Sequence, residues 1–193
     1  TGSAVSTFVN ENIAWEKNND ELLYEFMKKN GYTGLEIAPT RIFPDAPYEQ
    51  LGEANAWIEN LKKQYGLIVP SMQSIWFGRQ EKIFGTEEER QILLVYTKKA
   101  IDFAATIGCK NLVFGCPRNR SISDGEDVSI AISFFKELGD YAHKNRTVIG
   151  MEANPPIYNT NYKTIGEEMD LSHGLPYAPH RMKIKAGSYR DCK

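Results

Sequence analysis

Short apolar runs alternate along the chain with longer stretches in which apolar residues recur every three or four positions. Short runs rich in β-branched residues are typical of strands, and the recurring pattern is typical of amphipathic helices. The pattern predicts five strands at residues 5–9, 33–38, 67–73, 110–115 and 147–152. It predicts four helices between them, at residues 20–29, 48–65, 86–108 and 126–144.

The helix boundaries carry their own signals. Asn19 is a candidate N-cap for the first helix, and Thr86 with Glu89 forms a capping box at the start of the third. Gly66 and Gly108 are candidate C-caps. Residues expected to share one buried face are Leu22, Leu23, Phe26 and Met27 in the first helix, and Val128, Ile132, Phe135, Leu138 and Ala142 in the fourth.

The strict alternation of strands and helices predicts a parallel sheet with right-handed crossovers. An open nucleotide-binding sheet would carry a Gly-rich turn after its first strand, but residues 10–12 read Asn-Glu-Asn. Polar and aromatic residues instead follow each strand, where a βα-barrel keeps its active site. We therefore expect an α/β fold of the (β/α) TIM-barrel type, incomplete, with about five of the eight units of a full barrel.

The pattern changes near the C-terminus. Residues 1–165 are expected to be the N-terminal part of the barrel. Residues 166–193 lack an apolar helical stripe and are rich in Gly, Pro and basic residues, with one strand-like piece at 182–184. We interpret them as an irregular tail, either truncated or aberrant, for example out of frame.

Composition narrows the class of protein. The net charge is −2, from 23 basic and 25 acidic residues. The sequence therefore lacks the excess of basic residues that would neutralise the phosphates of a nucleic acid, and nucleic-acid binding has little support. No apolar run reaches the length of a membrane span, and the N-terminus lacks the pattern of a signal peptide. The three cysteines form no CxxC pair, which favours a cytoplasmic protein without disulfides.

The stretch from Val148 to Pro156 is the first candidate for chemistry. An apolar run ends in Glu152, and Asn154 and two prolines follow. Burying a carboxylate at the end of a strand is costly without a partner. Glu152 is therefore either ion-paired or a site residue.

Other side chains near strand ends are candidates for binding. Trp15, Trp76 and Phe77 are candidate walls of a sugar pocket, with loop packing as the alternative. Arg118 and Arg120 are candidates for bidentate contacts to a phosphate or carboxylate, with a solvated loop as the alternative.

Acidic and histidine side chains elsewhere are weaker candidates. Glu36 is a candidate substrate contact, but a buried ion pair or hydrogen bond is the favoured interpretation. His143 at a helix end is explained by the helix dipole. Asp170 and His173 have metal-pair spacing without a strand to support it.

Four strand-end segments carry a family resemblance: GLEI at 34–37, SMQS at 71–74, FGCPRNR at 114–120 and MEANPPIYNTNY at 151–162. They resemble the corresponding segments of sugar phosphate isomerases/epimerases of the xylose isomerase-like barrel superfamily. The resemblance covers about residues 5–162. It implies a small-molecule sugar or sugar phosphate as substrate.

The resemblance also implies a mechanism and its residues. Glu152 would be a metal ligand and the catalytic acid/base in proton transfer next to a carbonyl, through an enediolate. The metal would be Mn²⁺ or Mg²⁺, with Co²⁺ or Zn²⁺ as alternatives, and its other ligands would come from strands six to eight. Gln73, Asn154, Tyr158 and Asn159 join the substrate-binding candidates; Asn159 replaces a glutamate of the ketose 3-epimerases.

Two alternatives stay open. A partial barrel without the full metal set would be an inactive binding or association module, forming homo-oligomers through its exposed edges. An endonuclease IV-like site is disfavoured because it needs histidines at the ends of the third and fourth strands. Those ends carry Ser71, Gln73, Gly115 and Cys116.

Overall fold

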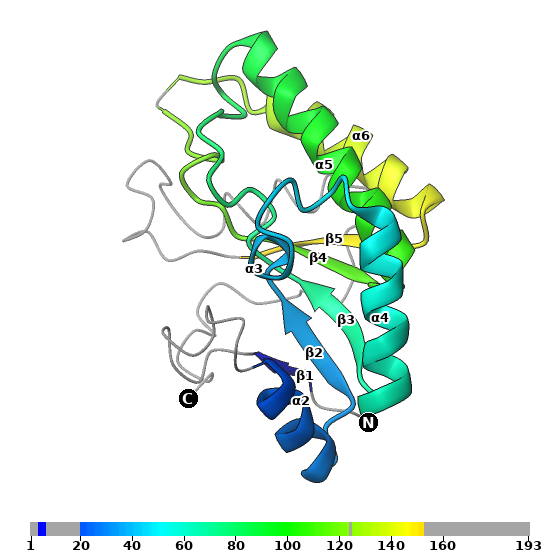
Figure 1. Cartoon of the computed structure of the whole chain (residues 1–193). Helices are drawn as coiled ribbons and strands as arrows, with labels where there is room; N and C mark the ends of the chain where they lie inside the picture. Colours follow the sequence, from blue (N-terminus) through cyan, green and yellow to red (C-terminus); the bar gives the residue numbers. More distant parts are fainter. Residues whose placement is uncertain (1–3, 7–19, 124, 153–193) are drawn as a thin grey trace, which may run out of the picture.

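The computed structural model describes residues 4–6, 20–123 and 125–152 (Figure 1). In this part of the chain, one sheet contains β1 (Ala4–Ser6), β2 (Gly34–Ile37), β3 (Ile68–Met72), β4 (Asn111–Phe114) and β5 (Val148–Met151). The helices are α2 (Asp20–Lys29), α3 (Pro39–Ile42), α4 (Leu51–Tyr65), α5 (Glu87–Ile107) and α6 (Ser129–Lys144). The predicted strands and helices are thus present, with boundaries that differ by a few residues.

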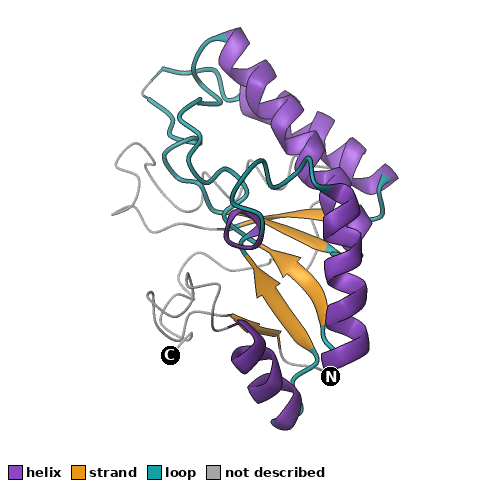
Figure 2. Ribbon diagram, in the orientation of Figure 1, coloured by secondary structure: helices purple, strands orange, loops and turns teal. Residues whose placement is uncertain are grey.

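The strand order settles the architecture. It runs β1-β2-β3-β4-β5, and every neighbouring pair is parallel. An open nucleotide-binding sheet reverses its order, whereas a barrel adds each strand on the same side of the last. Helices α4, α5 and α6 lie along one side of the strands, and loops gather at the arrowheads (Figure 2). The predicted TIM-barrel type of α/β fold is confirmed for the described residues.

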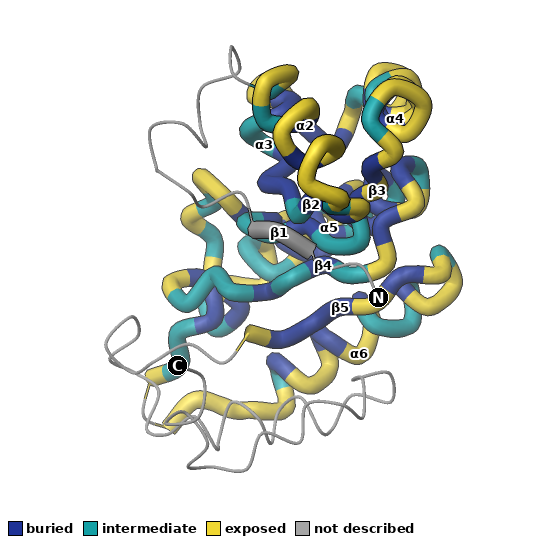
Figure 3. The backbone as a smooth tube through the Cα atoms, turned by 90° about the horizontal axis from the view of Figure 1, so that it is seen from below, coloured by how far each residue is buried: buried dark blue, intermediate teal, exposed yellow. Residues whose placement is uncertain are grey.

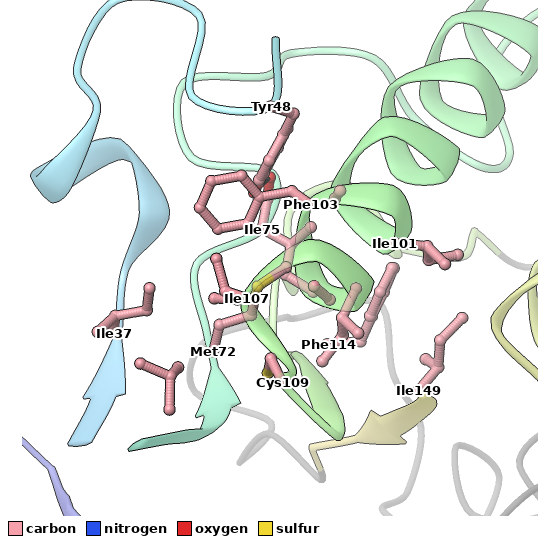
Figure 4. Packing of buried hydrophobic residues seen from close by; sticks show 14 of the residues in the cluster. Ile37, Tyr48, Met72, Ile75, Ile101, Phe103, Ile107, Cys109, Phe114 and Ile149 are labelled. Carbon is pink, nitrogen blue, oxygen red and sulfur yellow. Dashed lines mark hydrogen bonds between the residues drawn. The ribbon is translucent and has the colours of Figure 1, made fainter. Parts of the chain in front are cut away.

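An apolar layer between the sheet and the helices forms the core (Figure 4). Side chains from four strands and from α5 meet in it, among them Ile37, Met72, Phe114, Ile149, Ile101, Phe103 and Ile107. Phe114 lies edge-on to Trp76 and Phe135, with ring centroids 4.8 and 5.7 Å apart. Removing these side chains from water is the main contribution to the stability of the layer.

Helix α5 has the ends that its sequence predicts. The Thr86 hydroxyl accepts the N–H of Glu89, and the Glu89 carboxylate accepts the N–H of Thr86. Gly108 ends the helix in the left-handed conformation (φ 73°), which glycine adopts without a Cβ penalty. Although α5 spans 21 residues, no helix in the described ranges has the length and apolar character needed to cross a bilayer.

Two of the expected buried faces were partly wrong (Figure 3). Val128, which precedes α6, and Ile132 are 41% and 37% exposed, and the buried side chains of α6 are Ala131, Phe134, Phe135, Leu138 and Ala142. The sequence offers two overlapping stripes, and the one with both phenylalanines buries more apolar area. On α2, Leu22 and Phe26 are exposed and Tyr24 and Met27 are buried.

Helix α3 is not among the four helices that the pattern predicted. Pro39 has the fixed φ that suits a first helical position, and four residues complete a single turn. Arg41 in this turn forms an ion pair with Asp20 at the start of α2. The pair is largely buried, so the turn is anchored to the neighbouring helix.

The capping box on α5 predicts a stability effect. Thr86→Ala removes the acceptor for the Glu89 N–H and should lower the free energy of unfolding by about 1 kcal/mol. Thr86→Ser keeps the hydroxyl and should stay close to wild type. Urea denaturation of wild type and the two variants measures the free energy of unfolding. An equal loss of stability in Thr86→Ser and Thr86→Ala would mean that the methyl group, not the cap, is responsible.

Candidate active site

A pocket of about 260 Å³ opens beyond the C-terminal ends of β3, β4 and β5. This is the end of the sheet at which barrel enzymes place their chemistry. The residues that line it are Gln73, Ser74, Trp76, Phe77, Val113, Gly115, Cys116, Pro117, Asn119 and Glu152. Four of the predicted site residues, Gln73, Trp76, Phe77 and Glu152, are therefore brought together.

Glu152 is placed by the strand that precedes it. Its N–H donates to the Phe114 carbonyl (3.0 Å), so the ladder between β4 and β5 continues one residue past the end of β5. Its carboxylate lies over Gly115, where an added Cβ would overlap Oε2. The side chain is exposed to the pocket, so the carboxylate is accessible to a ligand.

Trp76 forms part of the pocket wall from inside the core. Only 2% of it is exposed, and its indole N–H donates to the Thr97 hydroxyl on α5 (2.8 Å). The neighbouring Phe77 is 59% exposed and also lines the pocket. Of these two candidate walls, Phe77 therefore offers the accessible aromatic face.

The two arginines after β4 lie in different surroundings. Arg118 is exposed and outside the pocket lining. Arg120 is 2% exposed, and its guanidinium donates to the carbonyls of Gly115 and Glu152. Nε and Nη2 of Arg120 are thus directed at backbone carbonyls, and an anion contact by either arginine stays a prediction.

Asn119 connects this turn to the segment after β3. Its amide donates to the carbonyls of Arg79 (3.1 Å) and Glu81 (2.8 Å), and its own carbonyl accepts the N–H of Ile83 (2.9 Å). Sequence reasoning did not identify this residue. An Asn in a turn has no local pattern that reveals contacts about 40 residues away.

Polar side chains also occupy aligned positions on three neighbouring strands. Glu36 on β2 is aligned with Ser71 on β3, which is aligned with Asn111 on β4. The Asn111 amide donates to the Ser71 hydroxyl (3.0 Å). Glu36 is half-buried and does not line the pocket. Trp15, Asn154, Tyr158 and Asn159, like Asp170 and His173, lie outside the described residues.

The thiol in the pocket is held in its neutral form. Burial raises the pKa of Cys116, a hydrogen bond with the Trp76 backbone and the Arg120 charge oppose this rise, and the Glu152 charge adds to it. Burial also raises the pKa of Cys109, to about 11. A thiolate nucleophile at neutral pH is therefore not supported.

The described residues do not form a metal site by themselves. Within residues 4–6, 20–123 and 125–152, no group of three His, Cys, Asp or Glu side chains is placed to hold an ion. Glu152 supplies one carboxylate ligand of the kind that hard cations prefer. The remaining ligands would have to come from outside this part of the chain.

Solved structures resemble this arrangement of strands and helices. D-psicose 3-epimerase from Clostridium cellulolyticum H10, crystallised with D-tagatose, has a TM-score of 0.66 and 13% identity, over 92% of this chain and 61% of that one. A sugar phosphate isomerase/epimerase from Parabacteroides distasonis has a TM-score of 0.54 and 16% identity, over 78% and 50%. The IolI protein with a bound zinc atom has a TM-score of 0.62 and 16% identity, over 91% and 59%.

These likenesses define the fold. The described chain has the fold of part of a xylose isomerase-like TIM barrel, and the solved structures that it resembles include sugar isomerases and epimerases. The chain spans about 50–61% of the first three barrels that it matches. No protein-family model matches the sequence.

Curated proteins give a short match of another kind. The L-lactate dehydrogenase 2 of Bacillus cereus and the L-lactate dehydrogenase of Bacillus velezensis are 55% and 52% identical over 31 residues. These residues are 16% of this chain and 10% of each dehydrogenase. A match of that length assigns no family to the chain.

The raised thiol pKa values predict slow alkylation. At pH 7.5, iodoacetamide should modify Cys116 and Cys109 roughly tenfold or more slowly in the folded than in the urea-unfolded protein, because the neutral thiol is unreactive. Because the pKa of Cys116 is raised, the rate at Cys116 in the folded protein should begin to rise at a higher pH than in the unfolded protein. Peptide mapping by mass spectrometry separates the cysteines; a rate at Cys116 equal to that in urea at pH 7.5 would contradict the prediction.

Proposed function

We propose that the protein acts on a sugar or sugar phosphate as an isomerase or epimerase, moving a proton on a carbon next to a carbonyl. The observation that carries the proposal is the position of Glu152. Its carboxylate lies over Gly115 in a pocket at the catalytic end of a barrel-type sheet. The likeness to sugar isomerases and epimerases supports the substrate class.

Glu152 takes the role of acid/base in this proposal. A carboxylate that reaches into a pocket at the strand ends is placed to accept a proton from a bound sugar and to return it. Phe77 and the edge of Trp76 provide apolar contact for a sugar ring, and Gln73 provides an amide for its hydroxyl groups.

A divalent metal belongs to the same proposal, with Mn²⁺ or Mg²⁺ before Co²⁺ or Zn²⁺. Such an ion would polarise the carbonyl oxygen of the sugar. Glu152 is its candidate ligand in the described part of the chain, and the bound zinc of the IolI structure supports a metal in a barrel of this fold. The residues described here do not complete its coordination, so we assign no step to it.

A second candidate is a binding or association module without catalysis. The observation that favours it is that, among the described residues, Glu152 is the one acidic side chain in the pocket lining. Such a module would bind a sugar without turning it over.

Substitution of Glu152 tests the enzyme proposal. With Mn²⁺ present, wild type should exchange a carbon-bound proton of D-fructose, D-psicose or D-tagatose with D₂O, as followed by NMR. Glu152→Gln keeps the shape and removes the base, and should lower kcat by roughly 10²- to 10⁴-fold. Glu53→Gln, on the exposed face of α4, is the matched control and should behave as wild type.

The outcomes separate the two candidates. Equal exchange rates in wild type and Glu152→Gln would remove Glu152 from the mechanism. Sugar binding by calorimetry without any exchange, in the presence of Mn²⁺, Mg²⁺, Co²⁺ or Zn²⁺, would favour the binding module. Titration of wild type and Glu152→Gln with Mn²⁺ measures metal affinity directly. If Glu152 is a ligand, Glu152→Gln should bind Mn²⁺ more weakly.

A further inference from the structure

The turn after β4 brings an arginine back over the strand ends. The Cys116 carbonyl accepts the N–H groups of Asn119 (3.1 Å) and Arg120 (3.3 Å), so residues 116–120 form one compact turn. The Arg120 side chain is 2% exposed. A buried guanidinium loses its hydration and must recover that free energy from well-placed acceptors.

The acceptors are backbone carbonyls of two neighbouring strand ends. Nε and Nη2 of Arg120 donate to the Gly115 carbonyl at 2.8 and 2.5 Å, and Nη2 also donates to the Glu152 carbonyl at 3.0 Å. Gly115 follows β4 directly, and Glu152 follows β5. The guanidinium therefore joins the two strands beyond their last paired residues, Phe114 and Met151.

The same two residues hold the candidate acid/base. Arg120 fixes the carbonyl of Gly115, and the carboxylate of Glu152 lies over the Cα of that glycine. Arg120 also fixes the carbonyl of Glu152 itself. The guanidinium of Arg120 thus holds the backbone from which the Glu152 side chain extends. It also holds the backbone of Gly115, over which the carboxylate lies.

We propose that Arg120 is the positioning residue for Glu152, acting through the carbonyls of Gly115 and Glu152. The proposal deepens the proposed function and rests on it for the catalytic role of Glu152. The planar fork of the guanidinium is required because it presents several N–H groups in fixed directions, whereas the three N–H groups of an ammonium rotate about one compact point charge.

Hydrogen exchange tests the brace without any need for turnover. The Glu152 N–H, which donates to the Phe114 carbonyl, should exchange at least about tenfold faster in Arg120→Met than in wild type, after correction for any change in global stability. The exchange rate in Arg120→Lys should lie between those of wild type and Arg120→Met. Arg120→Lys replaces Arg120→Met in the test if the latter does not fold. Arg146→Met, an exposed arginine ahead of β5, is the matched control. Equal acceleration at Leu112, Ile149 and Glu152, or none, would overturn the proposal.

The position of the carboxylate is a separate readout. The ¹³C resonance of the Glu152 carboxylate, assigned by its loss in Glu152→Gln, should shift in Arg120→Met. It should also shift in Gly115→Ala, whose added methyl meets the flexible end of Glu152 and leaves the Arg120 contacts in place. Gly115→Ala should keep wild-type exchange at the Glu152 amide. An unmoved carboxylate resonance in Arg120→Met would overturn the positioning role.

Kinetics separates this proposal from the proposed function. If wild type exchanges sugar protons, Arg120→Met should lower kcat roughly 10- to 100-fold with little change in KM, because a misplaced base affects the chemical step. A change in KM alone would count against positioning. If wild type shows no exchange with any sugar, the proposed function fails, and the amide and carboxylate readouts still decide the role of Arg120.

Discussion

The packing of β4 and β5 against the helices is the constraint on which the site depends. Side chains along a strand alternate between the two faces of a sheet. Leu112, Phe114, Ile149 and Met151 are buried, and Leu112 is paired with Ile149 and Phe114 with Met151. The apolar layer therefore fixes which residues face the other way. Gly115 and Glu152, one residue beyond Phe114 and Met151, are directed to the pocket because their predecessors are directed to the core.

The pocket combines a rigid side and an accessible side. Trp76 is held from within by Thr97 and by its edge-on contact with Phe114. Phe77 and Glu152 extend from this base toward solvent. A rigid base with a few exposed groups is the usual construction of small-molecule sites. The same arrangement suits a sugar-binding module as well as an enzyme. The two differ in whether a bound sugar is turned over.

The sequence predicted those features that local patterns encode. Helix α2 has the predicted bounds, and the capping box at Thr86 and the glycine at 108 mark the ends of α5. Alternation and the missing Gly-rich turn identified the barrel-type sheet. Local patterns failed where tertiary packing decides. They did not choose between the two apolar stripes of α6, and they gave no sign of the carbonyl partners of Arg120, which lie five and 32 residues away.

Asn119 has a consequence for how this end of the barrel can change. Its three hydrogen bonds tie the turn after β4 to residues 79–83, in the segment after β3. These hydrogen bonds therefore join the two loops into one structural unit. Grafting either loop alone from a related barrel would leave buried polar groups without partners. Recombination or design at this rim has to exchange both segments together.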